Sequence, residues 1–107
     1  MSRESLGHFE LLVLLALLRV GDEAYGVPIA RAIEQSSGKP VILASVYNTL
    51  ERLEQKGLVR STFGDPTPER GGRAKRYFAA TAAGLREVRA AKKALTVLWR
   101  GLPVYGG

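Results

Sequence analysis

The chain has 107 residues, of which 46% are hydrophobic and 24% are charged, and it contains no cysteine. This length supports one small hydrophobic core and is too short for a two-domain enzyme. The lack of cysteine excludes disulfide scaffolds, thiolate metal sites and thiol nucleophiles, and it favours a cytoplasmic protein. The formal net charge of +6 favours an anionic partner.

The charge is unevenly distributed along the chain. Residues 1–50 carry four basic and five acidic side chains, whereas residues 51–107 carry twelve basic and five acidic side chains. We therefore expect an anionic partner to contact the second half of the chain.

The most apolar stretch is the run of eight residues from Leu11 to Leu18. It is far shorter than the roughly 20 residues that span a bilayer. Acidic residues on both sides, Glu10 before the run and Asp22 after it, argue against a secretion signal. We therefore expect a helix that is buried nearly all round, and no membrane partner.

Glycines and capping residues divide the chain into four helices and one β-hairpin. Gly21, Gly38 and Gly57 follow helical patterns and predict where those helices end. Ser45 and Thr81 are suited to cap the helices that follow them. The predicted order is helix, helix, helix, hairpin and helix, over about residues 6–19, 26–35, 45–56 and 58–80, with the last helix from 81 to 100 or 102.

The third predicted helix separates its residues by face at about 100° per residue. Val46, Leu50 and Leu53 form a narrow stripe that must face the core. A different arc holds polar and cationic side chains and no carboxylate, namely Ser45, Asn48, Thr49, Arg52 and Lys56. A merely solvated helix usually mixes acids with bases, so this arc favours a helix that enters the major groove of DNA. Ordinary exposed polar residues are the alternative for this helix taken alone.

The hairpin carries a second cationic surface. Arg70, Arg73, Lys75 and Arg76 fall within seven residues at its tip and outgoing strand, where they suit phosphates or a minor groove. A short helix before the third helix and a basic hairpin after it follow the plan of a winged helix-turn-helix domain. The expected fold class is mainly α with a small β-hairpin.

Several stretches of the sequence resemble the PadR family of transcriptional regulators, and together they cover about residues 5–100. The resemblance implies a DNA-binding domain at residues 1–80 and a dimerisation helix with a tail at residues 81–107. Tyr47 lies within the matching part of the third helix and joins the expected DNA contacts. The matching stretches are residues 6–18, Ala24-Tyr25-Gly26, residues 45–59, Gly72-Arg73-Ala74-Lys75-Arg76-Tyr77-Phe78 and Thr81-Ala82-Ala83-Gly84.

One position departs from the family pattern. Asn48 stands where the family commonly has proline. The departure concerns base preference and not the fold.

The last predicted helix carries an apolar seam. Val88, Ala91, Leu95, Leu98 and Leu102 are spaced 3, 4, 3, 4, which is the alternation of a coiled coil. A helix of about twenty residues is ~30 Å long, longer than a domain of this size can cover. We therefore expect the seam to bury against a second copy of the chain. The alternative is that the helix folds back on the first helix of its own chain.

The family resemblance also implies how two copies pair. Short PadR-like proteins end in one helix that packs across a two-fold axis, often against the partner's first helix. This implies a homodimer that includes Leu11, Leu15 and Trp99 and that binds a pseudo-palindromic operator. Some relatives bind flat hydrophobic effectors through aromatic residues at this interface, so Trp99 either contacts such an effector or packs between the copies.

Residues suited to catalysis are few. His8 is the only histidine, and no His, Asp and Glu cluster has the spacing of a metal site. We therefore expect a binding protein and not an enzyme, with no metal or cofactor. The favoured hypothesis is a dimeric repressor released from DNA by an effector. The alternative is a winged-helix module that binds RNA or another protein.

Overall fold

The structure is a computed structural model and describes residues 6–64 and 75–103. Within these residues the elements confirm the predicted order and the mainly helical fold class. They are α1 (His8–Val20), the 3-10 turn η1 (Gly21–Glu23), α2 (Gly26–Ser37), α3 (Leu43–Gln55), β1 (Val59–Phe63), β2 (Arg76–Ala80) and α4 (Ala82–Trp99).

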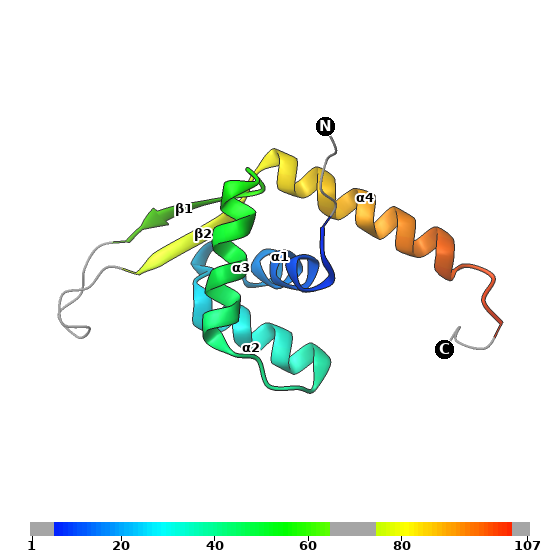
Figure 1. Cartoon of the computed structure of the whole chain (residues 1–107), viewed down its shortest axis with the longest axis horizontal. Coiled ribbons are helices and arrows are strands. Elements are labelled where there is room, and N and C mark those ends of the chain that lie inside the picture. Colours follow the sequence, from blue (N-terminus) through cyan, green and yellow to red (C-terminus); the bar gives the residue numbers. More distant parts are fainter. Residues whose placement is uncertain (1–5, 65–74, 104–107) are drawn as a thin grey trace.

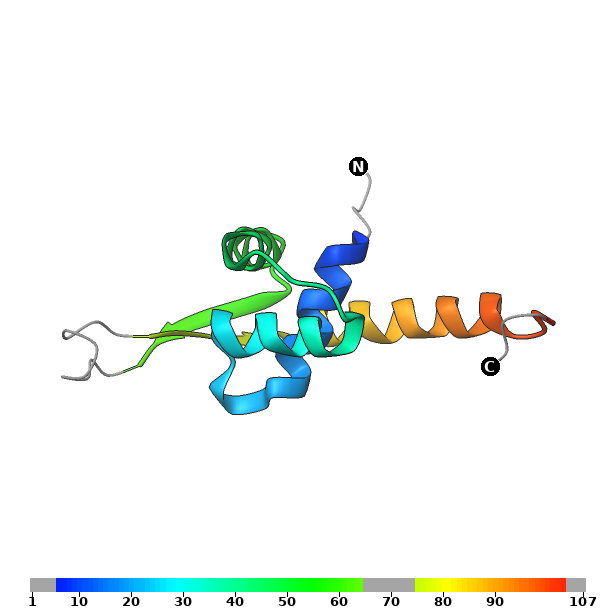
Figure 2. The same cartoon turned by 90° about the horizontal axis from the view of Figure 1, so that it is seen from below.

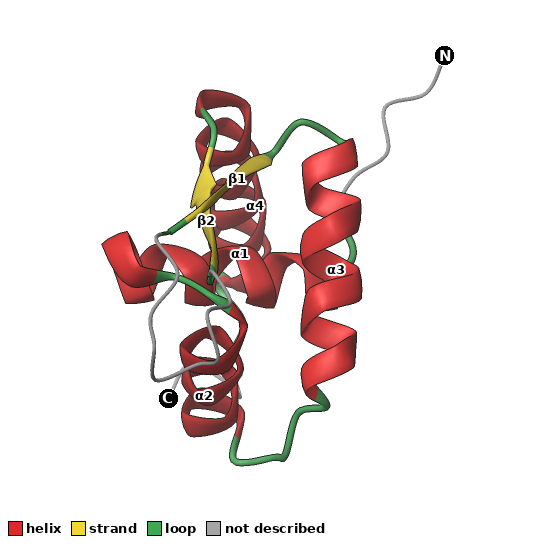
Figure 3. Ribbon diagram, turned by 90° about the vertical axis from the view of Figure 1, so that its left-hand side faces the viewer, coloured by secondary structure: helices red, strands yellow, loops and turns green. Residues whose placement is uncertain are grey.

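The helices α1, α2 and α3 form the body of the molecule. The hairpin and α4 leave this body in opposite directions along the long axis (Figure 1). α3 lies on one side of the body, outside α1 and α2 (Figures 2 and 3). One long side of α3 is therefore open to a partner, and the hairpin lies beside it.

The hydrophobic core lies where the three helices of the body meet the hairpin. Val46, Leu50 and Leu53 are completely buried, which confirms the predicted apolar stripe of α3. This stripe fixes the rotation of α3 about its axis. The other elements contribute Val13, Leu14, Leu17, Ala24, Ile29, Ile33, Leu58, Val59 and Phe78 to the same core.

α1 is buried on one face only, so the expectation of a helix buried nearly all round is wrong. Val13 and Leu14 have no exposed surface, but Leu15 and Leu18 on the other side are exposed. The physical reason is the direction of α4. It approaches α1 through the partly buried Val88 and then extends away from the body (Figure 1).

The hairpin is fastened to the connection between α1 and α2. β1 and β2 pair antiparallel, from Val59 opposite Ala80 to Phe63 opposite Arg76. Phe78 in β2 is buried, and its N–H donates to the carbonyl oxygen of Ala24 at 2.8 Å. The base of the hairpin is thus fixed relative to the helices. The hairpin tip, with the predicted contacts Arg70 and Arg73, lies outside the described residues.

The two predicted helix caps have different outcomes. Thr81 caps α4 as expected, since its hydroxyl oxygen accepts from the N–H of Gly84 at 3.1 Å. Ser45 does not cap α3, because the helix begins two residues earlier and its N-cap is Ile42, which makes no side-chain hydrogen bond. The N–H of Ser45 already donates to the carbonyl oxygen of Ile42 at 2.9 Å. Ser45 therefore lies inside the first turn.

The start of α4 lies directly against the segment that leads into β1. A Cβ atom on Gly84 would collide with the carbonyl oxygen of Leu58. The same oxygen accepts from the N–H of Thr81 at 3.0 Å, and the Thr81 hydroxyl donates to the carbonyl oxygen of Gly57 at 2.7 Å. Only glycine allows this approach, so Gly84 sets the direction in which α4 leaves the body.

We expect Gly84→Ala to lower the free energy of unfolding by about 1–3 kcal/mol, because overpacking must displace the Leu58 carbonyl. Helix propensity alone predicts the opposite, since alanine is about 1 kcal/mol better than glycine inside a helix. Thermal unfolding followed by circular dichroism should show a Tm lower by several degrees. Ala90→Gly, at an exposed position of α4, measures the effect of propensity alone. A Gly84→Ala variant more stable than the original chain would contradict the close contact.

Candidate nucleic-acid interface

The outward face of α3 differs from the arc predicted by the helical pattern. Its exposed residues include Glu51, which lies outside the predicted arc, so the exposed face is displaced from that arc toward Glu51. The reason is that the buried side of the helix extends beyond the apolar stripe to Thr49, which turns Glu51 outward. The exposed residues of α3 are Leu43, Ala44, Asn48, Glu51, Arg52 and Gln55.

The polar residues predicted for the exposed arc fall in different environments. Asn48 is exposed, as expected, and Ser45 is partly buried. Thr49 is only 1% exposed, so its predicted place on the exposed arc is wrong. Tyr47 is partly buried, and its ring lies where a Cβ on Gly26 of α2 would stand. Thr49 and Tyr47 therefore help to pack α3 against the other helices.

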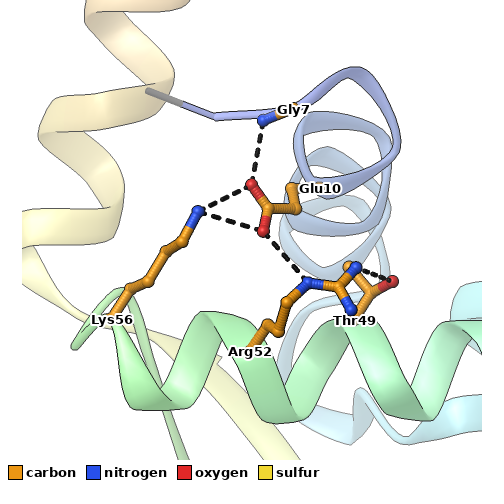
Figure 4. Close-up of polar contacts among 5 residues, drawn as sticks. All are labelled: Gly7, Glu10, Thr49, Arg52 and Lys56. Atoms are coloured by element: carbon orange, nitrogen blue, oxygen red, sulfur yellow. Dashed lines mark hydrogen bonds and ion pairs between the residues drawn. The ribbon is translucent and has the colours of Figure 1, made fainter. Parts of the chain in front are cut away.

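Glu10 of α1 binds two cations, Arg52 of α3 and Lys56, which directly follows α3 (Figure 4). The Nζ of Lys56 donates to both carboxylate oxygens, at 2.9 Å and 3.0 Å. The Nε of Arg52 donates to Oε2 at 3.4 Å, and the backbone N–H of Gly7 donates to Oε1 at 2.9 Å. A carboxylate from α1 thus lies against the side of α3 whose own residues are polar and cationic.

The environment of Glu10 favours its charged form. Burial raises the pKa of this carboxyl, but the Gly7 N–H and the contacts with Lys56 and Arg52 outweigh burial and lower the pKa below its ordinary 4.5. Burying a carboxylate requires such partners. Glu10 is therefore an ionised link between α1 and α3.

The two cations bound by Glu10 differ in their exposure to solvent. The Lys56 side chain is 23% exposed and turned toward α1, whereas the Arg52 side chain is 54% exposed. The Nη2 of Arg52 donates to the Thr49 hydroxyl at 3.3 Å, and among the described residues its Nη1 has no partner. Arg52 is thus held along one edge and presents its other edge to solvent.

Arg76, which was predicted to face DNA, is bound by carboxylates of α3. Its Nη1 donates to Glu51 and its Nη2 to Glu54, both at 2.7 Å. Its Nε donates to the Ser61 hydroxyl at 3.2 Å, and that hydroxyl donates to Glu54 at 2.9 Å. The hydrogen bond with Glu51 is the largest cause that raises the pKa of Arg76. Arg76 therefore joins the hairpin to α3.

Lys75 comes just before β2 and lies over an aromatic ring. Its Nζ lies 4.3 Å from the centre of the Tyr25 ring. The Tyr25 ring meets the Tyr77 ring edge-on, with centres 5.9 Å apart. Lys75 is partly exposed and, among the described residues, makes no ion pair. Its charge is thus available to an anionic partner.

Sequence reasoning missed the carboxylates that organise this surface. Glu10 had a signal, because a single acid at the start of an apolar helix must find cations if it is buried. Glu51 and Glu54 lie outside the polar arc, and nothing in the helical pattern pairs them with a residue of β2. Glu10 and Lys56 are 46 positions apart in the sequence, and Glu54 and Arg76 are 22 positions apart. Contacts over such distances do not follow from a local pattern.

Six of the eight residues expected at a dimer interface line an open groove between α1 and α4, and Ala91 and Leu98 lie outside its lining. The groove has a volume of about 680 Å³. Leu98 and Trp99 are 73% and 57% exposed, so the alternative of a helix folded back on α1 does not hold beyond Val88. Ala91 is partly exposed. The groove lining includes Leu11, Leu15, Val88, Lys92, Leu95, Trp99, Arg100 and Leu102.

The fold and the outward face of α3 define a winged helix-turn-helix protein, a class that binds DNA with the second helix of the motif. The model of the PadR-like family of transcriptional regulators matches residues 14–90, and the chain belongs to this family. Members of the family are transcriptional regulators and not enzymes. Within the described residues, no helix has the length and apolar character needed to cross a membrane.

Several solved structures share this fold. The structure of hsRosR-S1, described as a complex, is 26% identical, with a TM-score of 0.71 over 88% of this chain and 76% of that chain. A PadR family transcriptional regulator from Eggerthella lenta DSM 2243 is 29% identical, with a TM-score of 0.65 over 81% and 73% of the two chains. A PadR family regulator from Clostridium difficile R20291 is 21% identical and supports the fold, with a TM-score of 0.69 over 86% and 91%. A search of curated proteins finds no match.

We expect Glu10→Gln to lower the free energy of unfolding at pH 7 by about 1–2 kcal/mol, because charged hydrogen bonds to partly exposed cations are weakened. The pKa of Glu10 is lowered in the folded state, so its contribution is complete above about pH 4.5 and is lost as the pH falls below that value. Urea unfolding at pH 7 and at about pH 3.5 measures both effects.

Between these pH values the Glu10→Gln variant should lose less stability than the original chain. Asp22→Asn serves as the control, because Asp22 is exposed and makes no ion pair among the described residues. It should change stability by less than about 0.5 kcal/mol. An identical pH dependence in the original chain and the Glu10 variant would show that Glu10 is not the ionised link.

Proposed function

We propose that this regulator is a homodimeric repressor, that it binds a pseudo-palindromic operator through α3 and the hairpin, and that an effector releases it. The observation that carries the proposal is the outward face of α3, where Asn48 and one edge of Arg52 are exposed. A helix fits the major groove of DNA, which is about 12 Å wide. We also propose that the regulator acts in the cytoplasm, because it must reach DNA.

The proposed contacts divide into two kinds. Asn48 suits the edge of an adenine, and Arg52 suits a guanine, because the contacts with Glu10 and Thr49 already fix the direction of its guanidinium. Lys75 suits a phosphate, since it is a single charge on the hairpin. Arg70 and Arg73, from the part of the hairpin outside the described residues, are proposed to bind phosphates as well.

Substitutions should separate these two kinds of contact. Asn48→Ala should weaken binding to the operator by about 1–3 kcal/mol and leave binding to random duplex DNA nearly unchanged. Lys75→Gln should weaken binding to both DNAs and reduce the slope of log K against log salt by about 0.9. Fluorescence anisotropy with the chain's own promoter, measured over a range of salt concentrations, gives both quantities. Equal affinity of the original chain for promoter and random DNA would refute operator recognition and favour the alternative of an RNA-binding or protein-binding module.

We propose that two copies pair through the apolar seam of α4 and the exposed side of α1. Leu95 and Leu98 on α4 and Leu15 on α1 are large exposed hydrophobic residues on a small protein, and such surface is usually buried by a partner. A two-fold pair would present two copies of α3 to successive major grooves. The Trp99 end of the groove is the proposed effector site, because the Trp99 ring is flat, apolar and 57% exposed.

Leu98→Glu should convert the dimer to a monomer, since a charge on the seam has no partner once it is buried. Val97→Glu is the matched control, because Val97 is also exposed but lies about 100° around the helix from Leu98. Sedimentation velocity should show a dimer for the control and a monomer for Leu98→Glu. Dimers in both variants would place the interface elsewhere on the chain.

A further inference from the structure

Two carboxylates of α3 lie on the side where the hairpin meets it. Figure 1 shows the base of the hairpin beside α3. Glu51 is exposed, with 51% of its side chain open to solvent, and Glu54 is half-buried, with 32% open. Glu51 comes just before Arg52 and one turn after Asn48. A carboxylate therefore lies among the side chains proposed to read bases.

This placement creates an electrostatic problem for a DNA-binding helix. Duplex DNA carries one negative charge per about 1.7 Å of its axis, and like charges brought together across an interface weaken binding. Left uncompensated, Glu51 and Glu54 would repel the DNA that α3 is proposed to enter. The chain places one cation, Arg76 of β2, between them.

Arg76 has few donors left for a phosphate. Its Nε, Nη1 and Nη2 all donate within the cluster formed with Ser61, Glu51 and Glu54. Its side chain is only 28% exposed, and its guanidinium lies 5.0 Å from the centre of the Phe78 ring. The same contacts join the hairpin to α3, so they also fix the angle between the two elements.

We propose that Arg76 is a positioning residue that compensates part of the negative charge of Glu51 and Glu54 and holds the hairpin against α3, and that it does not contact the phosphate backbone. The inference rests on the proposed function, in which α3 and the hairpin bind DNA. It assigns Arg76 a role different from that of Lys75, its neighbour in the chain, which has no carboxylate partner among the described residues.

Removing the cation tests the role. Arg76→Gln should weaken binding to the promoter DNA by about 10- to 100-fold, because two carboxylates are exposed to the DNA. The slope of log K against log salt should stay nearly constant, since no phosphate contact is lost. Adding Glu51→Gln and Glu54→Gln to Arg76→Gln should restore part of the lost affinity, because the repulsion is removed while the link between the hairpin and α3 stays broken. Lys75→Gln is the matched control, and its loss should not be restored by the same two glutamines.

A second set of variants does not depend on the stability of Arg76→Gln. Glu51→Gln with Glu54→Gln, in a chain that keeps Arg76, should bind DNA at least as tightly as the original chain, because the cation is retained and its neighbours are neutral. Arg76→Lys should bind with intermediate affinity, since one ammonium cannot donate along three directions as a guanidinium does. Circular dichroism and Tm confirm that each variant is folded.

The outcomes separate the inference from the proposed function. A slope that falls by about 0.9 in Arg76→Gln, together with no recovery in the triple variant, would make Arg76 a phosphate contact and overturn the inference alone. If the original chain does not bind DNA in a salt-dependent way, both the proposed function and the inference fail. Recovery in the triple variant at constant slope supports the positioning role.

Discussion

The burial of one narrow apolar stripe on α3 decides how the rest of the molecule can work. Val46, Leu50 and Leu53 lose all contact with solvent, and burying each such side chain contributes about 1.5–3 kcal/mol. Because side chains on a helix are separated by about 100°, this packing also determines which polar residues of α3 face outward. The surface offered to DNA is thus a by-product of how the core is filled.

Polar contacts on both sides of α3 then hold the helix in that rotation. Glu10 of α1 binds the side that carries Arg52 and Lys56, and Arg76 of β2 binds the side that carries Glu51 and Glu54. The two pairings have opposite signs. On one side a carboxylate from α1 binds cations, and on the other side a cation from β2 binds carboxylates of α3. Each pairing reduces the charge that α3 alone would present, and Asn48 and one edge of Arg52 are left between the two.

The sequence predicts the elements of this fold well and their mutual contacts poorly. Helix ends at Gly57 and the cap at Thr81 depend on neighbouring residues, so local patterns were enough. The start of α3 was misplaced because Ser45 is a good cap by type, whereas the chain uses the apolar Ile42 at that place. The helical pattern could not anticipate Glu10 or Arg76 as partners of α3, because such ion pairs depend on how distant segments are brought together by the fold.

The contact between Gly84 and Leu58 gives α4 the character of a lever arm. A helix of eighteen residues is about 27 Å long, so a tilt of about 10° at its first turn would move its far end by about 5 Å. In a two-fold dimer joined along this helix, both copies would be displaced by that amount. Successive half-sites on DNA lie about 34 Å apart. Because Gly84 has no Cβ, α4 can pack closely against Leu58. This packing therefore affects the distance between the two DNA-binding helices of a dimer.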